Sequence, residues 1–197
     1  EAYLNQLIER RDNGMIKIVT GIRRCGKSYL LFTIFKRYLL ESGVPEDHII
    51  EIALDGIENE ELRDPKVCFR YITDAMRGDG PYYLLLDEVQ FMPRFEEVLN
   101  SLLRMSNIDV YVTGSNSKML SSDILTEFRG RSDEIRVHPL SFAEYYTAVG
   151  GDKQDAFDEF AFYGGMPLIL SRPTDAAKMA YLKSLFSEVY LKDIVAV

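Results

Sequence analysis

The sequence predicts an α/β fold of three layers, in which helices cover both faces of a mostly parallel sheet, followed by a small helical subdomain. Up to residue 140, short β-rich runs alternate with helical stretches, as in chains that build a parallel sheet. The runs at 83–86 and 110–112 are continuously apolar, which suits strands buried on both faces. Beyond residue 140 only helical patterns remain. We therefore expect a core over residues 1–140 and a helical lid over residues 141–197.

The first part of the core reads as helix, strand, helix, strand. A helix is expected over 2–11, because Leu4, Leu7 and Ile8 share one face and a turn signal follows. The β-rich run at 15–21 predicts a strand, and the long apolar stretch at 28–43 predicts a helix that Gly43 ends. A second strand is expected over 49–54.

The rest of the core continues the alternation. Residues 59–77 read as helical, with Pro65 badly placed unless a new helix begins there. Strands are expected over 81–88, 109–115 and 134–140, and a helix over 95–106.

The lid is predicted to contain helices over 141–149, 155–164 and 177–195. Ser141 and Glu144 form a capping-box signature at the start of the first. The chain begins at Glu1 instead of a methionine, and its last helical run has no stop signal. We therefore expect a piece of a longer protein.

The composition is that of a globular protein, and it narrows the classes of function. Apolar residues make up 47 %, and 23 basic against 31 acidic side chains leave a net charge of −8. An acidic surface disfavours broad binding to a nucleic-acid backbone, and no apolar run approaches the ~18 residues that a membrane span needs. Cys25 and Cys68 lie far apart without metal-ligand spacing, which predicts a reducing, cytoplasmic environment.

Residues 21–28, GIRRCGKS, match the phosphate-loop pattern G-x-x-x-x-G-K-[ST] at every fixed position and lie between a predicted strand and a predicted helix. The glycines let backbone amides turn toward phosphate oxygens, and the helix points its positive end at the anion. Lys27 is expected at the β- and γ-phosphates, where it assists catalysis, and the Ser28 hydroxyl at Mg²⁺. The predicted nucleotide-binding residues are Gly21, Ile22, Arg23, Arg24, Cys25, Gly26, Lys27, Ser28 and Tyr29.

Two carboxylates follow the buried run at 83–86. Asp87 is expected at the carboxyl edge of the sheet, where it helps to hold Mg²⁺ as a Walker B residue. Glu88 is expected to act as general base toward the attacking water. The alternative is an ordinary acidic turn.

Two further residues are candidates for a catalytic role. Asn116, with Ser115 as second choice, follows the strand at 109–115 and is placed to contact the γ-phosphate or the water, unless it is only a turn or helix cap. Arg131, with Arg129 as second choice, is the candidate arginine finger, acting in cis or from a neighbouring subunit. A surface salt bridge is the alternative for either arginine.

Taken together, these motifs resemble the AAA+ superfamily. They are most similar to a prokaryotic ATPase family that carries GxRRxGKS, LLLDEVQ, TGSN, GR and PLSF motifs. This sequence has them at 21–28, 84–90, 113–116, 130–131 and 139–142. The resemblance implies a five-stranded P-loop NTPase sheet in the order 5-1-4-3-2, and a further C-terminal domain. It also implies that Pro167, in the sequence GGMP, lies against the adenine.

The function predicted from these residues is Mg²⁺-dependent ATP binding and hydrolysis to ADP, coupled to a conformational change. The competing hypotheses are a nucleotide switch that does not hydrolyse ATP, and a small-molecule kinase. The partners left open are other copies of the chain and a target that is either protein or nucleic acid. No membrane partner is expected.

Overall fold

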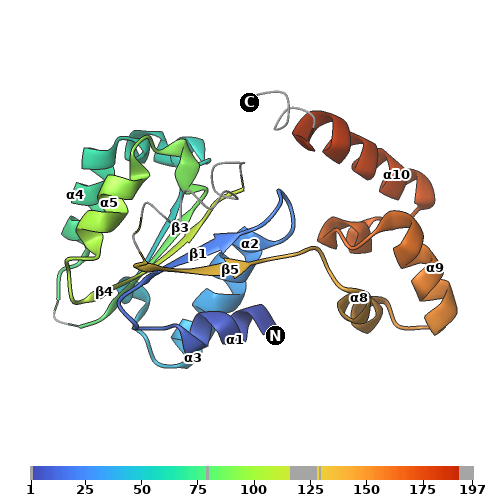
Figure 1. Ribbon diagram of the computed structural model, residues 1–197, viewed down its shortest axis with the longest axis horizontal. Coiled ribbons are helices and arrows are strands. Elements are labelled where there is room, and N and C mark those ends of the chain that lie inside the picture. The colour runs from blue at the N-terminus through green and yellow to red at the C-terminus, as the bar shows by residue number, and fades with distance from the viewer. Residues whose placement is uncertain (1, 79, 116–127, 129, 191–197) are drawn as a thin grey trace. The chain divides into compact units, whose positions relative to one another are not determined.

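The core of the protein is a five-stranded parallel sheet (Figure 1). The computed structural model describes residues 2–78, 80–115, 128 and 130–190. The strands lie in the order β2-β3-β4-β1-β5, which confirms the predicted order read from the other end. They are β1 Ile16–Thr20, β2 Ile49–Ala53, β3 Tyr82–Asp87, β4 Ile108–Thr113 and β5 Ser132–Arg136.

Strand β4 lies between β1 and β3 although it follows both in the chain. Val112 of β4 is in register with Ile18 of β1 on one side and with Leu86 of β3 on the other. Because all the pairings are parallel, the carboxyl ends of these three strands meet at one edge of the sheet. The polar residues that follow each strand are therefore neighbours.

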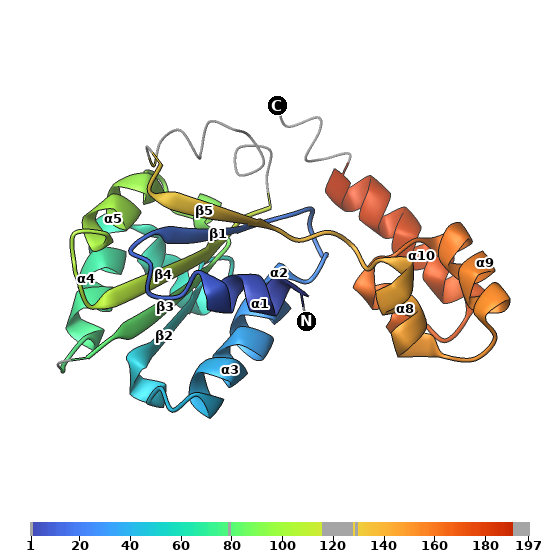
Figure 2. The same ribbon diagram turned by 60° about the horizontal axis from the view of Figure 1, so that its bottom comes forward.

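Helices cover both faces of the sheet (Figure 2). On one face lie α1 Ala2–Glu9 and a continuous helical stretch made of α2 Lys27–Tyr29, the π-helix η1 Leu30–Phe35 and α3 Lys36–Glu41. On the other face lie α4 Pro65–Ala75 and α5 Phe95–Leu102. Short 3₁₀ turns, η2 Glu46–His48, η3 Ile57–Arg63 and η4 Val89–Phe91, connect these elements.

The helix predicted over 59–77 is two elements, η3 and α4. Pro65 occupies the first turn of α4, where its missing N–H costs no hydrogen bond. Asp64 caps that helix, since its carboxylate accepts from the amides of Lys66 at 2.9 Å and Val67 at 3.1 Å. The division therefore falls where the proline allows a new helix to begin.

The last strand lies earlier than the range 134–140 predicts. Its final residue, Arg136, is in register with Thr20, the last residue of β1. Beyond Thr20 the chain turns into the loop that starts at Gly21, so no further ladder partner exists on that side of β5. Strand β5 therefore ends level with the last residue of β1.

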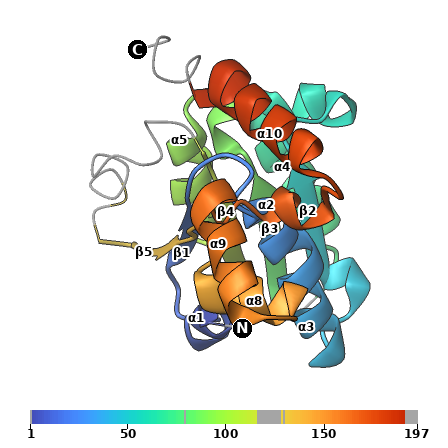
Figure 3. The ribbon, with the colours of Figure 1, turned by 90° about the vertical axis from the view of Figure 1, so that its right-hand side faces the viewer.

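Contacts divide the chain into two units. The first holds the sheet and its helices, and the second comprises Ile22–Gly26 and Val137–Val197. The elements of the second unit are α8 Phe142–Val149, α9 Lys153–Tyr163, η5 Pro167–Ser171, α10 Asp175–Ser184 and the π-helix η6 Leu185–Tyr190 (Figure 3).

The second unit has a small core of its own, and its capping box is confirmed. The Ser141 hydroxyl accepts from the Glu144 amide at 3.3 Å, and the Glu144 carboxylate accepts from the Ser141 amide at 2.9 Å. Apolar and aromatic side chains from all its helices meet in one cluster. Its buried members are Tyr145, Tyr163, Met166, Ile169, Tyr181 and Leu185.

A fully buried lysine stabilises the amino edge of the sheet, opposite the edge where β1, β3 and β4 end. Lys17 of β1 forms an ion pair with Asp109 of β4 and donates to the Met15 carbonyl at 2.9 Å. Asp109 also accepts from the Tyr111 hydroxyl at 2.8 Å and from the Asp12 amide at 2.9 Å. Burial lowers the pKa of Lys17, while the Asp109 carboxylate acts in the opposite direction. Every charge in this cluster therefore has a partner.

We expect Lys17→Met to lower the free energy of unfolding by about 3–5 kcal/mol, because the Asp109 carboxylate would be left buried without its cation. Urea denaturation followed by circular dichroism measures the change. The matched control is Lys36→Met, which removes a partly exposed ion pair with Glu51 and should cost at most about 1 kcal/mol. Equal losses in the two variants would contradict the role assigned to the buried pair.

Candidate functional site

The predicted phosphate loop connects β1 to α2. Its two glycines have positive φ angles, 145° at Gly21 and 105° at Gly26, and Arg24 is left-handed with φ 64°. Lys27 is 4 % exposed, and its ammonium donates to the Gly21 carbonyl at 2.9 Å. Lys27, which the motif predicts to bind phosphate, is thus buried, and the carbonyl of the first loop residue orients its ammonium group.

The middle of the loop, Ile22–Gly26, belongs to the second unit. The thiol of Cys25 is buried and donates to the Val137 carbonyl at 3.6 Å. Arg24 lies close enough to the Tyr181 hydroxyl to lower the pKa of that group, although burial outweighs it and the net direction is upward. Arg172 lies over the same ring at 5.5 Å.

Asp87 is the last residue of β3 and is 4 % exposed. Burial raises the pKa of its carboxyl, and hydrogen bonds from the hydroxyls of Thr113 and Ser28 act in the opposite direction. The structure thereby brings together Ser28 of the loop and Asp87 of the strand, as the sequence predicts. A hydroxyl and a carboxylate are oxygen ligands of the kind Mg²⁺ takes, with water completing the shell, so the donor set fits this ion.

Thr113, the last residue of β4, connects the two acidic residues. Its hydroxyl donates to the Asp87 carboxylate and accepts from the Glu88 amide at 3.0 Å. Glu88 is held in the left-handed region with φ 53°, a conformation that costs a non-glycine residue free energy. The threonine therefore orients both the side chain of Asp87 and the backbone of Glu88.

The Glu88 carboxylate has two polar neighbours. The Ser115 hydroxyl lies 3.1 Å and 2.8 Å from its two oxygens, and the Gln90 amide nitrogen donates to Oε2. Within the described chain, the other end of the Gln90 amide, Oε1, is buried without a hydrogen-bond partner. Glu88 is thus positioned by side chains from two strand ends.

The candidate arginine finger is not brought to this cluster. Arg131 precedes β5, at the amino edge of the sheet, where its guanidinium donates to the Asn100 side chain at 2.9 Å. Asp87 and Glu88 lie at the opposite edge. Tyr29 is 63 % exposed. Asn116 and Arg129 lie outside the described residues.

Pro167 begins η5 in the second unit, next to a tightly packed turn. The Leu140 amide donates to the Gly165 carbonyl at 2.7 Å, and a Cβ on Gly165 would lie 2.0 Å from the Leu140 carbonyl oxygen. The glycine is therefore required for the GGMP turn to pack against the PLSF segment. That requirement is structural and is independent of any ligand at Pro167.

Thr113 and Gln90 were not among the predicted site residues. A signal existed for both, since Thr113 ends a strand in the TGSN motif and Gln90 lies two residues beyond the Glu88 carboxylate. What the sequence does not show is that β4 pairs with β3, and this pairing brings Thr113 to Asp87.

The fold and this edge of the sheet define the class: an AAA+ type of P-loop NTPase fold. The structure resembles Cdc6p of Pyrobaculum aerophilum, with a TM-score of 0.56 and 15 % identity over 92 % of this chain and 62 % of that one. It also resembles C. elegans PCH-2, with a TM-score of 0.53 and 17 % identity over 83 % of this chain and 46 % of that one.

Sequence comparison gives the family. The profile of a family described as an AAA domain matches residues 13–146, so the chain belongs to that family. An uncharacterized protein of Haemophilus influenzae is 32 % identical over 98 % of this chain. The chain spans 50 % of that relative's length. In the part of the chain that the structure describes, no helix is long and apolar enough to cross a membrane.

We expect Asp87→Asn to stabilise the protein by about 1 kcal/mol at neutral pH in the absence of Mg²⁺ and nucleotide. Because burial raises the pKa of this carboxyl, its ionised form costs free energy, and the folded state loses stability as pH rises through the titration. The gain should shrink as the pH falls through the raised pKa of the folded state, and it should be lost below about pH 4, the ordinary pKa of an aspartate, where the wild-type carboxyl is protonated in both states. Urea denaturation at several pH values measures it.

The control for that substitution is Asp47→Asn, which neutralises an exposed carboxylate of the same unit that is not among the groups shifting the pKa of Asp87, and should change little. A less stable Asp87→Asn protein would contradict the charge argument and would show that the carboxylate is needed for folding.

Proposed function

We propose that this chain binds ATP together with Mg²⁺ and hydrolyses it to ADP and phosphate, and that hydrolysis is coupled to a conformational change. One observation carries the proposal: the last residue of the phosphate loop, Ser28, donates to Asp87, and Glu88 follows directly. A phosphate loop, a metal-type carboxylate and a general base at one sheet edge are what NTP hydrolysis requires.

The loop supplies the phosphate contacts in this proposal. Its backbone amides and the first turn of the helical stretch from Lys27 favour an anion, and the Lys27 ammonium neutralises the β- and γ-phosphates. In the structure this ammonium donates a hydrogen bond to the Gly21 carbonyl at 2.9 Å. A phosphate oxygen is a stronger, charge-assisted acceptor, so exchange of one acceptor for the other favours binding.

Ser28 and Asp87 are the residues that would hold Mg²⁺. When bound, the ion neutralises charge on the phosphates. The buried Asp87 carboxylate has hydroxyl donors but no described cation beside it. Burial raises the pKa of this carboxyl, and the negative charges of Glu88 and Asp55 act in the same direction.

Glu88 is the general base in this proposal. It takes a proton from water as the water oxygen bonds to the γ-phosphorus and the bond to the β–γ bridging oxygen breaks. Ser115 and Gln90 are positioning residues, because their hydrogen bonds orient the carboxylate. Thr113 holds the Glu88 backbone in its left-handed conformation.

Three further roles belong to the same proposal. Asn116, next to Ser115, contacts the γ-phosphate or the water, and Pro167 lies against the adenine. Arg131 lies at the far edge of its own sheet, so we assign it a finger role only toward the nucleotide of a neighbouring subunit.

We expect Lys27→Ala to weaken ATP binding by about tenfold to a hundredfold, the worth of one or two charge-assisted hydrogen bonds. Isothermal titration calorimetry with ATP and Mg²⁺ measures the affinity. Arg37→Ala, on the same helical stretch but exposed, is the control and should bind as the wild type does. Undiminished affinity in Lys27→Ala would remove the phosphate-loop assignment.

We expect Glu88→Gln to keep ATP affinity within about threefold and to lower the rate of phosphate release by about 10²–10⁴-fold, since only the base is lost. A phosphate-release assay beside the calorimetric titration separates the two effects. If wild type and variant share the same background rate, the chain is a nucleotide switch. If phosphate appears on an acceptor molecule instead of in solution, it is a kinase.

A further inference from the structure

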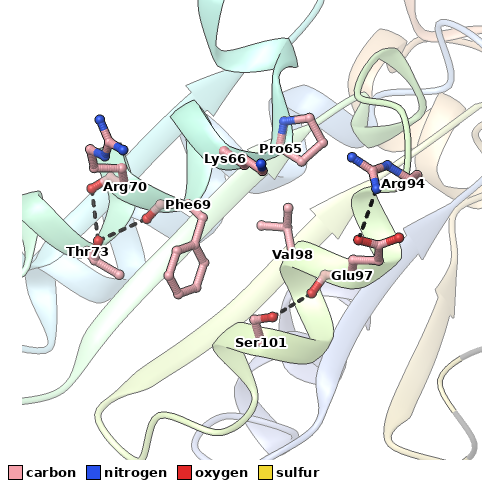
Figure 4. A pocket seen from close by; sticks show the side chains of 9 residues that line it. All are labelled: Pro65, Lys66, Phe69, Arg70, Thr73, Arg94, Glu97, Val98 and Ser101. Carbon is pink, nitrogen blue, oxygen red and sulfur yellow. Dashed lines mark hydrogen bonds and ion pairs between the residues drawn. The ribbon is translucent and has the colours of Figure 1, made fainter.

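A groove on the first unit lies between α4 and α5, and neither Asp87 nor Glu88 lines it (Figure 4). It encloses about 510 Å³. Phe69 of α4 and the buried Val98 of α5 give it an apolar floor, and the side chains of Lys66, Arg70 and Arg94 line it. We call these five residues the basic groove.

The cations of the basic groove have little local compensation. Arg94 lies 3.6 Å from the exposed carboxylate of Glu97, but no ion pair joins Lys66 or Arg70 to another described residue. Both side chains are exposed. On a chain with a net charge of −8, three cations around an apolar floor form a surface suited to an acidic segment with an apolar side chain.

The chain itself carries such a segment. The start of η3, residues 57–61, presents the exposed carboxylates of Glu58, Glu60 and Glu61. Beside them Ile57 is 83 % exposed, the most of any large apolar side chain described. We call residues 57–61 the acidic turn. Because Ile57 is exposed, the turn does not fill the basic groove of its own chain.

Exposed apolar side chains concentrate around the same elements. The first unit has six described large apolar side chains that are exposed, and four of them belong to η3, α4 and η4. These four are Ile57, Val67, Tyr71 and Phe91. Such a concentration is typical of a surface that another protein covers.

We propose that the basic groove binds the acidic turn of a second copy of this chain, with Ile57 against the apolar floor and the glutamates against Lys66 and Arg70. Each copy carries both surfaces, and η3 runs directly into α4 through the cap at Asp64. Two copies can therefore exchange the same contact twice across a twofold axis, which is the commonest way in which identical chains associate. The contact involves neither Asp87 nor Glu88, nor any residue of the phosphate loop.

The test is sedimentation velocity on the 197-residue chain without nucleotide or Mg²⁺, so that its outcome is independent of the ATPase proposal. We expect a concentration-dependent dimer whose dissociation constant rises as the salt concentration is raised from about 0.05 to about 0.5 M. The double variants Lys66→Glu/Arg70→Glu and Glu60→Lys/Glu61→Lys should each weaken association by about tenfold or more, because like charges then face one another.

Mixing the two double variants in equal amounts should restore a dimer. In a mixed pair the groove that now carries glutamates meets the turn that now carries lysines, and the two unaltered surfaces also meet, so opposite charges face one another at both contacts. Ile57→Ser should weaken association without altering charge. The matched controls are Arg37→Glu/Lys183→Glu, with the same charge change on exposed residues elsewhere, and Phe162→Ser, which removes a large apolar side chain that is 70 % exposed. Both controls should associate as the wild type does.

Circular dichroism confirms that each variant is folded before it is compared. A wild-type chain that stays monomeric at all concentrations overturns the proposal. So does a dimer that survives reversal of Lys66 and Arg70, or a mixture of the two reversed variants that fails to associate.

Discussion

The placement of β4 between β1 and β3 is the constraint on which the candidate site depends. Parallel pairing in this order brings the carboxyl ends of β1, β3 and β4 to one edge of the sheet. The last residues of β1 and β4, Thr20 and Thr113, are 93 positions apart in the chain. The Thr113 hydroxyl makes the connection local, because it donates to Asp87 while it accepts from the Glu88 amide. Without β4 in that position, the two carboxylates would lack the group that orients them.

Buried charges are compensated differently at the two edges of the sheet. At the amino edge, Lys17 and Asp109 neutralise each other and their remaining hydrogen-bonding capacity is filled by Met15, Tyr111 and Asp12. At the carboxyl edge, Asp87 is as deeply buried but has only neutral hydroxyl donors, and the pKa of its carboxyl is raised. The first arrangement stabilises the fold, whereas the second leaves a buried carboxylate without a described cation, and such a perturbed group is typical of a functional site.

Much of the local structure follows from the sequence. The capping box at Ser141 and Glu144, the turn of helix that begins at Pro65 and the pairing of Ser28 with Asp87 all agree with the sequence patterns. The contacts of Glu88 were harder to predict. The sequence ranks Ser115 behind Asn116 and does not single out Gln90, because the left-handed turn at Glu88 decides which side chains its carboxylate contacts.

The sequence by itself determined the loop, the apolar strands, the two carboxylates and the helix caps, since each of these depends on residues within a few positions of one another. Only the tertiary structure decided which edge of the sheet each distant residue occupies. Arg131 and Glu88 both adjoin strands, yet Arg131 precedes β5 and Glu88 follows β3. In a parallel sheet these positions are at opposite edges, because the direction of each strand, and not the spacing of residues along the chain, fixes the end at which a side chain lies.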